Sequence, residues 1–335
     1  MAPIEPIQPI ESIQPEEQTL FPITVLYHAN CNDGFAAAWA AFQYFKHTAK
    51  YIPVNYAEPV PVIPKETAVL LIVDFSYPLE ILQQLSKRIP EIIILDHHKT
   101  AQEALAQLNP IPSTLELIRN CPTGREMVFT PGLFARFNML ESGASLTWRF
   151  FYPEGKLPPI IAYAKERDLF TKRLPYTDEI YNWMLSYEKT FAIWDILAKR
   201  LADEYPSEYR PGTPALEGQA LMRKQRADVG YLCTRAYPIR LLGYTIYAVN
   251  TPINQSECGQ VLLSQYPEIP FSLSYFELPG HKIVFSLRSS ADRENFDVSK
   301  IAEHFGGGGH RNAAGFVLSA DKAFQLLHGN LAEKE

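Results

Sequence analysis

Acidic and imidazole side chains follow three apolar segments early in the sequence, at the points where those segments end. They are His28, Asp33, Asp74, Asp96, His97 and His98, and a further acid, Asp168, lies in the later segment KERDLF. Carboxylate oxygens and imidazole nitrogens together suit Mn²⁺, with iron or Zn²⁺ as competitors, whereas a thiolate-rich set would indicate structural zinc. Two ions bridged by Asp74 could clamp a phosphoryl oxygen and lower the pKa of a shared water towards neutrality. The residue types therefore predict metal-assisted hydrolysis at phosphorus.

Each of these side chains also has a purely structural interpretation. Asp33 could cap the helix that starts FAAAWAAF, because an aspartate after a strand is more often an N-cap than a ligand. Asp168 could pair with a neighbouring lysine or arginine. The triplet at positions 96–98 is harder to explain in this way, since the apolar run Ile92–Leu95 leads straight into one acid and two imidazoles. Burying three titratable groups without partners is costly, and a cation would offset that cost, so we favour a metal site.

The elements that must bring these residues together are the strands of a parallel sheet. From residue 21 to residue 120, short β-branched or aliphatic segments (TVLYHAN, YIPVNY, AVLLIVDF, EIIILDHH and LELIRN) alternate with longer amphipathic ones. Strands that are apolar throughout and alternate with helices are typical of a parallel sheet covered by helices on both faces. Ligands of such sheets bind at the carboxyl ends of the strands, which is where the polar residues fall.

The rest of the chain divides into a helical stretch and a second α/β unit. Residues 133–235 look almost wholly helical, and the later segments IRLLGYTIYAVN, FSLSYF, KIVFSLRSS and FVLSA look like strands with short helices between them. The expected fold class is α/β, with a parallel-sheet N-terminal domain, a helical connector and a smaller mixed α/β C-terminal domain. The predicted boundaries are a disordered proline-rich tail at 1–19, a metal-binding catalytic domain at 20–185, the connector at 186–235 and a substrate-binding domain at 236–335.

Length, charge and cysteine content limit the possible functions. At 335 residues, with 47% hydrophobic and 20% charged, the chain is long enough for two cores. The formal net charge of −6 argues against stable binding of duplex DNA by charge alone. Four scattered cysteines without CxxC spacing fit reduced thiols, and no apolar stretch reaches the roughly 20 residues of a spanning helix. We expect a soluble, cytoplasmic protein with no membrane association.

A glycine run near the C-terminus is a candidate anion site. Gly306, Gly307, Gly308 and Gly309 are followed directly by His310 and Arg311. Without Cβ atoms the backbone can reach positive φ and bring several N–H groups to a phosphate, and the two residues after the run can add charge-assisted hydrogen bonds. Arg288, at the end of KIVFSLRSS, is a second candidate for binding a substrate phosphate. The alternatives are a flexible connector for the glycine run and a solvated strand end for Arg288.

In this order, the motifs resemble those of the DHH phosphoesterase superfamily, which is named for the triplet at 96–98. The segments HANCNDG, VDFSYP and ERDLF resemble its other N-terminal motifs, and GGGGHRNAAG is similar to the signature of the DHH-associated C-terminal domain. The resemblance extends over residues 24–316, nearly the whole expected folded region. Members of the superfamily include single-strand exonucleases, nanoRNA-degrading enzymes, cyclic-dinucleotide phosphodiesterases and inorganic pyrophosphatases.

The resemblance implies roles for individual residues. The implied metal ligands are His28, Asp33, Asp74, His97 and Asp168. Among these, Asp74 would be the bridge between two ions. His98 falls where the family contacts the scissile phosphate, and Asp96 would orient or support the imidazoles.

The first motif departs from the family pattern. Most relatives carry two acids separated by one residue where this chain has Cys31-Asn32-Asp33, so a single carboxylate is left. One ion would then have fewer anionic ligands and could bind weakly or only with substrate. Asn32 or Cys31 could contribute, although a cysteine after an apolar strand is more often a buried small hydrophobe.

The expected function is that of a manganese-dependent phosphohydrolase of the phosphodiesterase or exonuclease type. Its substrates would be phosphodiester or phosphomonoester bonds in short oligonucleotides or nucleotides, cleaved by a metal-activated water. Two Mn²⁺ ions are the expected cofactor, with Mg²⁺ or another divalent ion as a substitute, and the chain could form a homodimer. Two alternatives stay open: a phosphoanhydride hydrolase of the exopolyphosphatase or pyrophosphatase kind, and a catalytically impaired nucleotide-binding protein.

Overall fold

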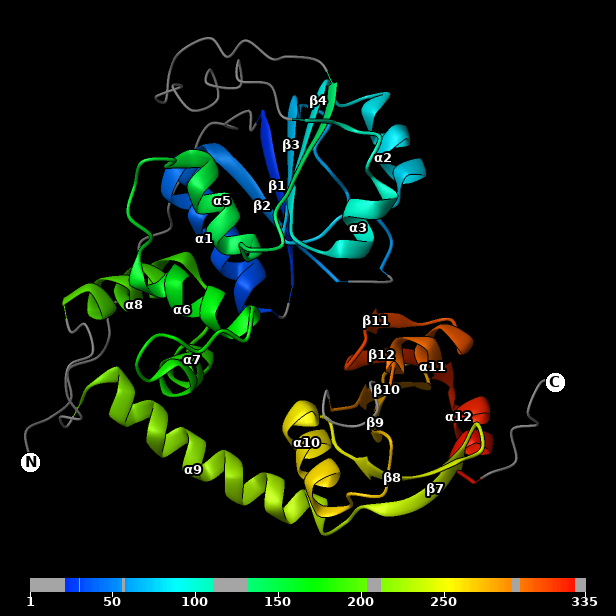
Figure 1. Cartoon of the computed structure of the whole chain (residues 1–335). Helices are drawn as coiled ribbons and strands as arrows, with labels where there is room; N and C mark the ends of the chain where they lie inside the picture. Colours follow the sequence, from blue (N-terminus) through cyan, green and yellow to red (C-terminus); the bar gives the residue numbers. More distant parts are fainter. Residues whose placement is uncertain are drawn as a thin grey trace, which may run out of the picture. The chain divides into compact units, whose positions relative to one another are not determined.

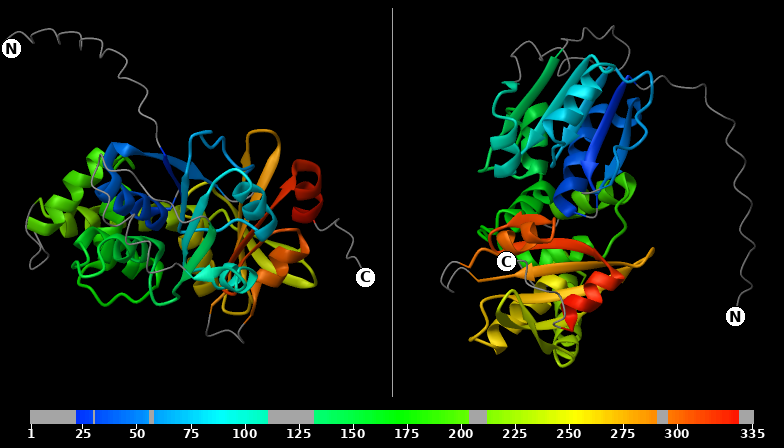
Figure 2. Two further views of the ribbon diagram at one scale, coloured as in Figure 1. Left: turned by 90° about the horizontal axis from the view of Figure 1, so that it is seen from above. Right: turned by 90° about the vertical axis from the view of Figure 1, so that its right-hand side faces the viewer.

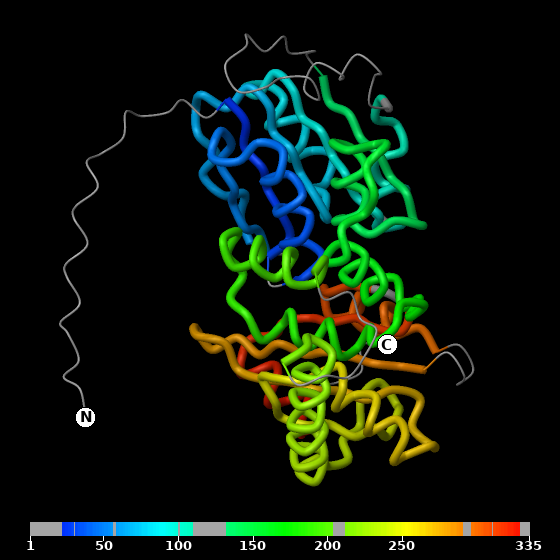
Figure 3. Tube along the Cα trace, turned by 90° about the vertical axis from the view of Figure 1, so that its left-hand side faces the viewer, coloured from blue at the N-terminus to red at the C-terminus, as the bar shows by residue number. Residues whose placement is uncertain are grey.

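The computed structural model describes residues 22–29, 31–55, 58–110, 132–203, 212–290 and 296–328. The chain divides into two units, Met1–Gln219 and Ala220–Glu335, and each has its own sheet (Figures 1 and 3). The predicted tail at 1–19 and the predicted strand LELIRN lie outside the described residues.

A six-stranded parallel sheet forms the centre of the first unit. Its strands lie in the order β2-β1-β3-β4-β6-β5, and every neighbouring pair is parallel. They are β1 (Ile23–His28), β2 (Ala49–Val54), β3 (Val69–Val73), β4 (Glu91–Asp96), β5 (Asn109–Pro110) and β6 (Gly132–Phe137). Every residue of β3 and β4 is buried, which explains why both contain unbroken apolar runs.

Helices cover both faces of this sheet (Figures 1 and 2). They are α1 (Asn32–Phe45), α2 (Leu79–Ser86), α3 (Lys99–Ala104), α5 (Gly143–Phe151), α6 (Pro159–Asp168), α7 (Thr177–Leu185) and α8 (Phe191–Asp203), with a 3-10 turn at Lys46–Thr48. In β3, Leu71 and Val73 pack into a core with α1 and α5, whereas Leu70 and Ile72 pack into a second core with α2. The expected α/β class with a doubly covered parallel sheet is confirmed.

Residues 132–137 differ from the expected helix. The segment GLFARF is β6, which pairs with β4. Its Leu133, Ala135 and Phe137 pack against the same core as α2, and this alternation of side chains is the signature of a strand. The prediction that 133–235 is almost wholly helical is therefore wrong for its first residues, and the described elements that follow β6 in the first unit are helices.

The predicted connector at 186–235 contains α8 and a longer helix, α9 (Pro214–Cys233). Trp194 and Leu197 of α8 are buried in the core of the first unit, so this helix packs as part of that unit. Helix α9 is 20 residues long and includes the boundary between the two units. Among the residues that the structure describes, no helix is both long enough and apolar enough to cross a membrane.

A mixed six-stranded sheet forms the second unit. The strand order is β11-β12-β10-β9-β8-β7, with β8 and β9 parallel and the other neighbours antiparallel. The strands are β7 (Tyr237–Leu241), β8 (Tyr244–Asn250), β9 (Ser272–Leu278), β10 (Lys282–Arg288), β11 (Gly308–His310) and β12 (Ala313–Ser319), and the helices are α10 (Gln255–Gln265), α11 (Val298–His304) and α12 (Ala320–Leu327). Phe285 and Leu287 of β10 are fully buried in its core. The expected smaller mixed α/β unit is confirmed.

The predicted strand IRLLGYTIYAVN is two strands rather than one. Leu242 (φ 46°) and Gly243 (φ 80°) separate β7 from β8, and these strands pair as an antiparallel hairpin. Two consecutive positive φ angles are typical of the tight turn whose twist matches that of a hairpin. Leucine rarely adopts such an angle, so only the glycine marked this turn in the sequence.

Candidate metal centre

Three neighbouring strands of the first sheet bring polar side chains to its carboxyl edge. β1 ends in His28, Asp74 directly follows β3, and β4 ends in Asp96, directly before His97. The parallel register of β1, β3 and β4 leaves these ends level with one another. The edge is the one at which parallel α/β sheets bind ligands.

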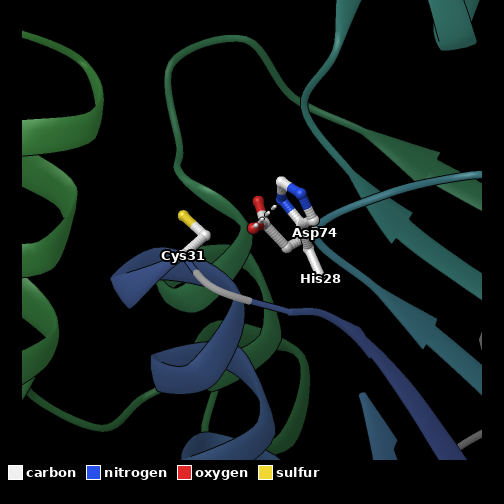
Figure 4. A group of neighbouring side chains, drawn as sticks. All are labelled: His28, Cys31 and Asp74. Atoms are coloured by element: carbon white, nitrogen blue, oxygen red, sulfur yellow. Dashed lines mark ion pairs between the residues drawn. The ribbon is translucent and has the colours of Figure 1, made fainter. Parts of the chain in front are cut away.

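Asp74 is the centre of the resulting cluster. Its side chain is 2% exposed, with Oδ2 3.6 Å from His28 Nδ1 and Oδ1 3.2 Å from His97 Nε2. Figure 4 shows the first of these ion pairs. His97 Nε2 also lies 3.5 Å from Oδ2 of Asp168, the last residue of α6. Four of the five residues predicted as metal ligands are therefore connected through direct contacts.

Asp33, the fifth predicted ligand, joins the cluster from the first turn of α1. Its carboxylate is buried, and both oxygens lie 3.3 Å from the backbone N–H of Ala144, which donates to them from the first turn of α5. Ligand atoms of Asp33, His97 and Asp168 lie within 4.8 Å of one another. The structure thus brings all five residues to one place.

The backbone of Asp74 has an unusual conformation that aims the side chain into the cluster. Its φ is 64°, in the left-handed region that aspartate and asparagine tolerate better than most residues. Its N–H donates to the carbonyl of Leu95 at 3.0 Å, which ties the residue to β4. Gly143, the first residue of α5, lies so close that a Cβ there would be 2.4 Å from both Cβ and Oδ1 of Asp74. A glycine is therefore required at that position.

Asp96 holds the two histidines of the triplet in place. It is fully buried, and its Oδ1 accepts hydrogen bonds from the backbone N–H of His97 at 2.7 Å and of His98 at 3.2 Å. The same oxygen lies 2.7 Å from His98 Nδ1, and Oδ2 accepts a hydrogen bond from Ser76 Oγ at 2.7 Å. Because a carboxylate faces Nδ1, that nitrogen carries the proton, and Nε2 points away from Asp96. Both oxygens of Asp96 are engaged, so it positions the histidines.

The carboxylates of the cluster influence one another strongly. Burial, followed by the charges of Asp74 and Asp168, raises the pKa of Asp33 well above its usual value. Burial is also the main reason that the pKa of Asp168 is raised. Burial would raise the pKa of Asp74 too, but the neighbouring imidazoles of His28 and His97 outweigh it and hold that pKa below its usual range. Several acids thus share a site that favours added positive charge.

The donor set fits a divalent cation. Ligand atoms within 4.8 Å of one another occur in three groups, which are His28, Cys31 and Asp74; Asp74, His97 and His98; and Asp33, His97 and Asp168. The buried Oδ1 of Asp74 accepts no hydrogen bond in the described structure, so it keeps a lone pair for a cation. Carboxylate and imidazole ligands suit Mn²⁺, iron and Zn²⁺. The acids and imidazoles that the sequence singled out could therefore hold a metal.

The stability of the metal-free protein is expected to fall as the pH rises above about 6.5. Burial lowers the pKa of both His97 and His98, but their carboxylate neighbours more than offset this and raise both values above 6.5. The folded state therefore holds more protons than the unfolded state. The ion pairs with Asp74 and Asp96 stabilise the fold fully below pH 6.5, and this contribution is lost as the pH passes through the raised values.

Differential scanning calorimetry of the EDTA-treated protein, from about pH 6 to about pH 9, would measure this decline as a falling Tm. Saturating Mn²⁺ should remove most of it, because a metal binds the neutral imidazole and takes over the role of the proton. The lowered pKa of Asp74 has the opposite sign, but it acts only below pH 3.8, outside this range. A Tm that rises with pH in EDTA would contradict the assignment.

The structure does not support the purely structural roles considered for Asp33 and Asp168, which were a helix cap and an ion pair with a neighbouring lysine or arginine. The side chain of Asp33 does not cap its own helix, since the N-cap of α1 is Cys31 and the carboxylate accepts from α5 instead. Lys165 pairs with Glu141 at 2.7 Å. The guanidinium of the neighbouring arginine at 167 lies over two aromatic rings. Asp168 instead contacts His97 of the triplet.

The glycine run of the second unit forms a turn followed by a strand. Gly306 has φ 77° and Gly309 has φ 142°, and β11 pairs with β12 from Gly308 onward. A Cβ at Gly307 would lie 2.1 Å from the carbonyl oxygen of Gly315, so this position is closely packed, whereas a Cβ at Gly308 would meet no atom within 4 Å. The paired strand and the close packing at Gly307 do not fit the alternative of a flexible connector.

Arg288 lies one strand away from the end of the glycine run, because Ala313 of β12 pairs with both His310 and Arg288. The Arg288 guanidinium donates to Ser256 Oγ at 2.7 and 3.0 Å and to Ser286 Oγ at 3.0 Å. Arg311 follows β11, and its carbonyl oxygen accepts a hydrogen bond from the N–H of Val298. Arg288 and the end of the glycine run therefore lie on the two strands that flank β12.

Some contributors to the site were not predicted from the sequence. Ser76 binds Asp96, Gly143 makes room for Asp74, and the N–H of Ala144 binds Asp33. Small residues in VDFSYP and ESGASLTW were the available signals, but a serine or glycine is common beside any strand or helix end. Cys31, which we favoured as a buried small hydrophobe, contributes to one of the three candidate ligand groups.

Comparison with known proteins agrees with this arrangement. Residues 244–332 match the DHHA1 domain family. The chain is 30% identical over 315 residues to "Uncharacterized protein R106" of Acanthamoeba polyphaga mimivirus, an alignment that covers 89% of this chain and 68% of the viral protein. The parallel sheet of the first unit carries the Asp-His-His triplet, and the DHHA1 match lies in the second unit. The chain belongs to the DHH phosphoesterase superfamily.

Two solved structures are similar at low identity. The pGpG-specific phosphodiesterase PggH of Vibrio cholerae is 13% identical, with a TM-score of 0.43 and coverage of 90% of this chain and 95% of that one. RecJ of Thermus thermophilus, solved in complex with Mn²⁺, is 16% identical, with a TM-score of 0.43 and coverage of 90% and 50% respectively. Both are too distant to transfer a substrate or a cofactor to this chain.

Proposed function

We propose that this protein is a metal-dependent phosphoesterase that hydrolyses phosphodiester or phosphomonoester bonds in short oligonucleotides or nucleotides. The observation that carries the proposal is the buried Asp74 carboxylate, whose two oxygens face two different histidines. A carboxylate in that position is suited to bridge two cations. Two Mn²⁺ ions match the oxygen and nitrogen donors around it, with Mg²⁺ or another divalent ion as a substitute.

The proposed ligands are His28, Asp33, Asp74, His97 and Asp168. When bound, the ions would polarise the phosphoryl group and lower the pKa of a water molecule. His98, held through Nδ1 by Asp96, would direct Nε2 at the phosphoryl oxygens and stabilise the charge that develops on them. Because Asp96 fixes the backbone of both histidines, a ligand and a phosphate-binding group keep a constant spacing.

The second unit is proposed to bind another phosphate of the substrate. The proposed residues are Gly306, Gly307, Gly308, Gly309, His310, Arg311 and Arg288. Backbone N–H groups in a glycine-rich turn can surround an anion, and arginine adds charge-assisted hydrogen bonds. A site of this kind favours short substrates with several phosphates, in agreement with a net charge of −6 that disfavours long nucleic acids.

Replacing Gly308 with valine is expected to raise KM about tenfold with little change in kcat, as expected for the loss of one charge-assisted hydrogen bond. A side chain there would block the approach of a phosphate to the backbone, yet its Cβ meets no atom within 4 Å, so the fold should be kept. Steady-state kinetics on a dinucleotide measures the effect. Gly307→Ala is the contrasting variant, because its Cβ would clash with Gly315 and lower Tm. An unchanged KM in Gly308→Val would contradict the anion site.

The substrate class can be tested with one Mn²⁺-supplemented panel. It would compare dinucleotides, longer single strands, adenosine 3′,5′-bisphosphate, cyclic dinucleotides and polyphosphate, each with and without EDTA. EDTA-sensitive hydrolysis of the short nucleotides would support the proposal. Turnover of polyphosphate alone would favour a phosphoanhydride hydrolase. Binding of nucleotides without turnover would favour a catalytically impaired binding protein. This alternative is considered because the first motif, Cys31-Asn32-Asp33, has only one carboxylate.

A further inference from the structure

The first motif places a thiol among the candidate ligands. The Sγ of Cys31 belongs to a group with His28 and Asp74 in which the ligand atoms all lie within 4.8 Å of one another. Figure 4 shows Cys31 at the start of α1, with the Asp74 carboxylate between the thiol and the His28 ring in this view. Cys31 is the N-cap residue of α1, yet its side chain makes no capping hydrogen bond. The thiol therefore does not act as a helix cap.

The surroundings of Cys31 differ from those of the other cysteines in the described parts of the chain. Cys233 and Cys258 are buried members of an apolar cluster with Val249 and Leu262. Cys31 is only partly buried and belongs to none of the described apolar clusters. A cysteine that served as a small hydrophobe would be expected in an apolar environment such as that of the other two. The position of Cys31 instead favours a role in chemistry.

Two further observations around the first motif indicate a cation there. Asp74 Oδ1 is buried, and although it faces His97 Nε2 at 3.2 Å, no contact from the described residues to this oxygen has hydrogen-bond geometry. Asn32, next to Cys31 in the chain, is 1% exposed, and neither atom of its amide has a hydrogen-bond partner within the described ranges. Buried polar atoms without partners are rare because each costs free energy. A cation near the carboxylate would offset part of that cost.

We propose that Cys31 supplies a thiolate ligand to one of the two metal ions, together with His28 and Asp74. The inference rests on the proposed metal-dependent function and specifies which ion the first motif selects. The thiol proton passes to solvent when the metal binds, so the ligand carries a single negative charge, as a carboxylate does. A thiolate is a softer ligand than a carboxylate. Thiolates favour Zn²⁺, Co²⁺ and Fe²⁺ over Mg²⁺, so this position discriminates against Mg²⁺.

Titration of the full-length, EDTA-stripped protein with Co²⁺ tests the inference by absorption spectroscopy. The wild type should develop a thiolate-to-cobalt charge-transfer band in the near ultraviolet as the sites fill. Cys31→Ser should lose the band and bind one of the two Co²⁺ ions at least about a hundredfold more weakly. Losing a partner of a ligand already costs about 10–100-fold, and losing a ligand itself should cost no less. Cys233→Ala is the matched control, and it should keep the band because Cys233 lies in an apolar cluster.

Cys31→Asp provides the second arm of the experiment. It should bind two ions without the charge-transfer band and shift the preference towards Mn²⁺ and Mg²⁺, measured by calorimetric titration. Two Co²⁺ ions bound by the wild type without the band, or a band that survives in Cys31→Ser, would overturn the thiolate ligand and leave the proposed phosphoesterase function standing. A wild type that binds neither Co²⁺ nor Mn²⁺ would overturn both.

Discussion

Replacing Asp74 with asparagine is expected to reduce kcat/KM by on the order of a thousandfold or more, because one side chain would serve both ions of the centre. Its oxygens face His28 and His97 at 3.6 and 3.2 Å, and a neutral amide offers only one oxygen and less charge. Asparagine is preferable to alanine here, since the φ of 64° strains most residues but suits asparagine. Hydrolysis of a dinucleotide with Mn²⁺, together with calorimetric titration of the metal, measures the loss.

Ser76→Ala is the matched control for this prediction. Ser76 donates to Asp96, which positions the histidines and holds no ion in the proposed arrangement. Removing such a partner typically costs about 10–100-fold, so the serine variant should retain about ten times or more the activity of the Asp74→Asn variant. Far-ultraviolet circular dichroism shows whether both variants are folded. Comparable activity of a folded Asp74→Asn variant and the wild type would refute the bridging role.

The second large effect is expected from a single added methyl group at Gly143. An alanine Cβ there would lie 2.4 Å from Cβ and Oδ1 of Asp74, closer than real contacts allow. Either α5 moves away from the sheet or the carboxylate turns out of the cluster. We expect Gly143→Ala to lower stability by about 1–3 kcal/mol and kcat/KM by on the order of a hundredfold, because misplacement by about 1 Å is enough to disrupt alignment. Thermal unfolding and steady-state kinetics measure the two effects.

Gly230→Ala separates this clash from the general effect of alanine in a helix. Gly230 lies in α9, and a Cβ there would meet no atom within 4 Å. Alanine is the better helix former, so this variant should be unchanged or more stable by about 0.5–1 kcal/mol. Wild-type activity in Gly143→Ala would mean that α5 can shift without disturbing Asp74, and the close packing would then have no functional meaning.

The sequence was sufficient to predict the sheet and the principal side chains at its edge. Apolar runs such as Ile92–Leu95 are buried on both sides and admit few other structures. An acid or imidazole directly after such a run must lie at the carboxyl edge, because the parallel connection fixes the direction of the strand. Asp168 comes from a helix far along the chain, and its place beside His97 rested on the family motif alone.

The parts that could not be predicted depend on contacts between distant segments. The segment GLFARF has only three alternating apolar side chains, which is too short a pattern to identify a strand. It forms one because it pairs with β4. Leu242 takes a positive φ because the hairpin of β7 and β8 imposes it, against the preference of leucine. The need for glycine at 143 follows from Asp74, which comes much earlier in the chain, before β4, β5 and β6. Small residues such as those in ESGASLTW indicate that a helix packs closely against the sheet, but local sequence does not identify the residue it packs against.

The separate hydrophobic cores of the two units have a consequence for the evolution of the protein. Each of the four apolar clusters in the described residues falls within one unit. Substitutions that reshape the second unit therefore leave the packing beneath Asp74 and the triplet untouched, and effects at well-separated sites are close to additive. Natural selection could thus vary the C-terminal unit, by point mutation or by recombination, while the candidate metal centre of the N-terminal unit is inherited intact.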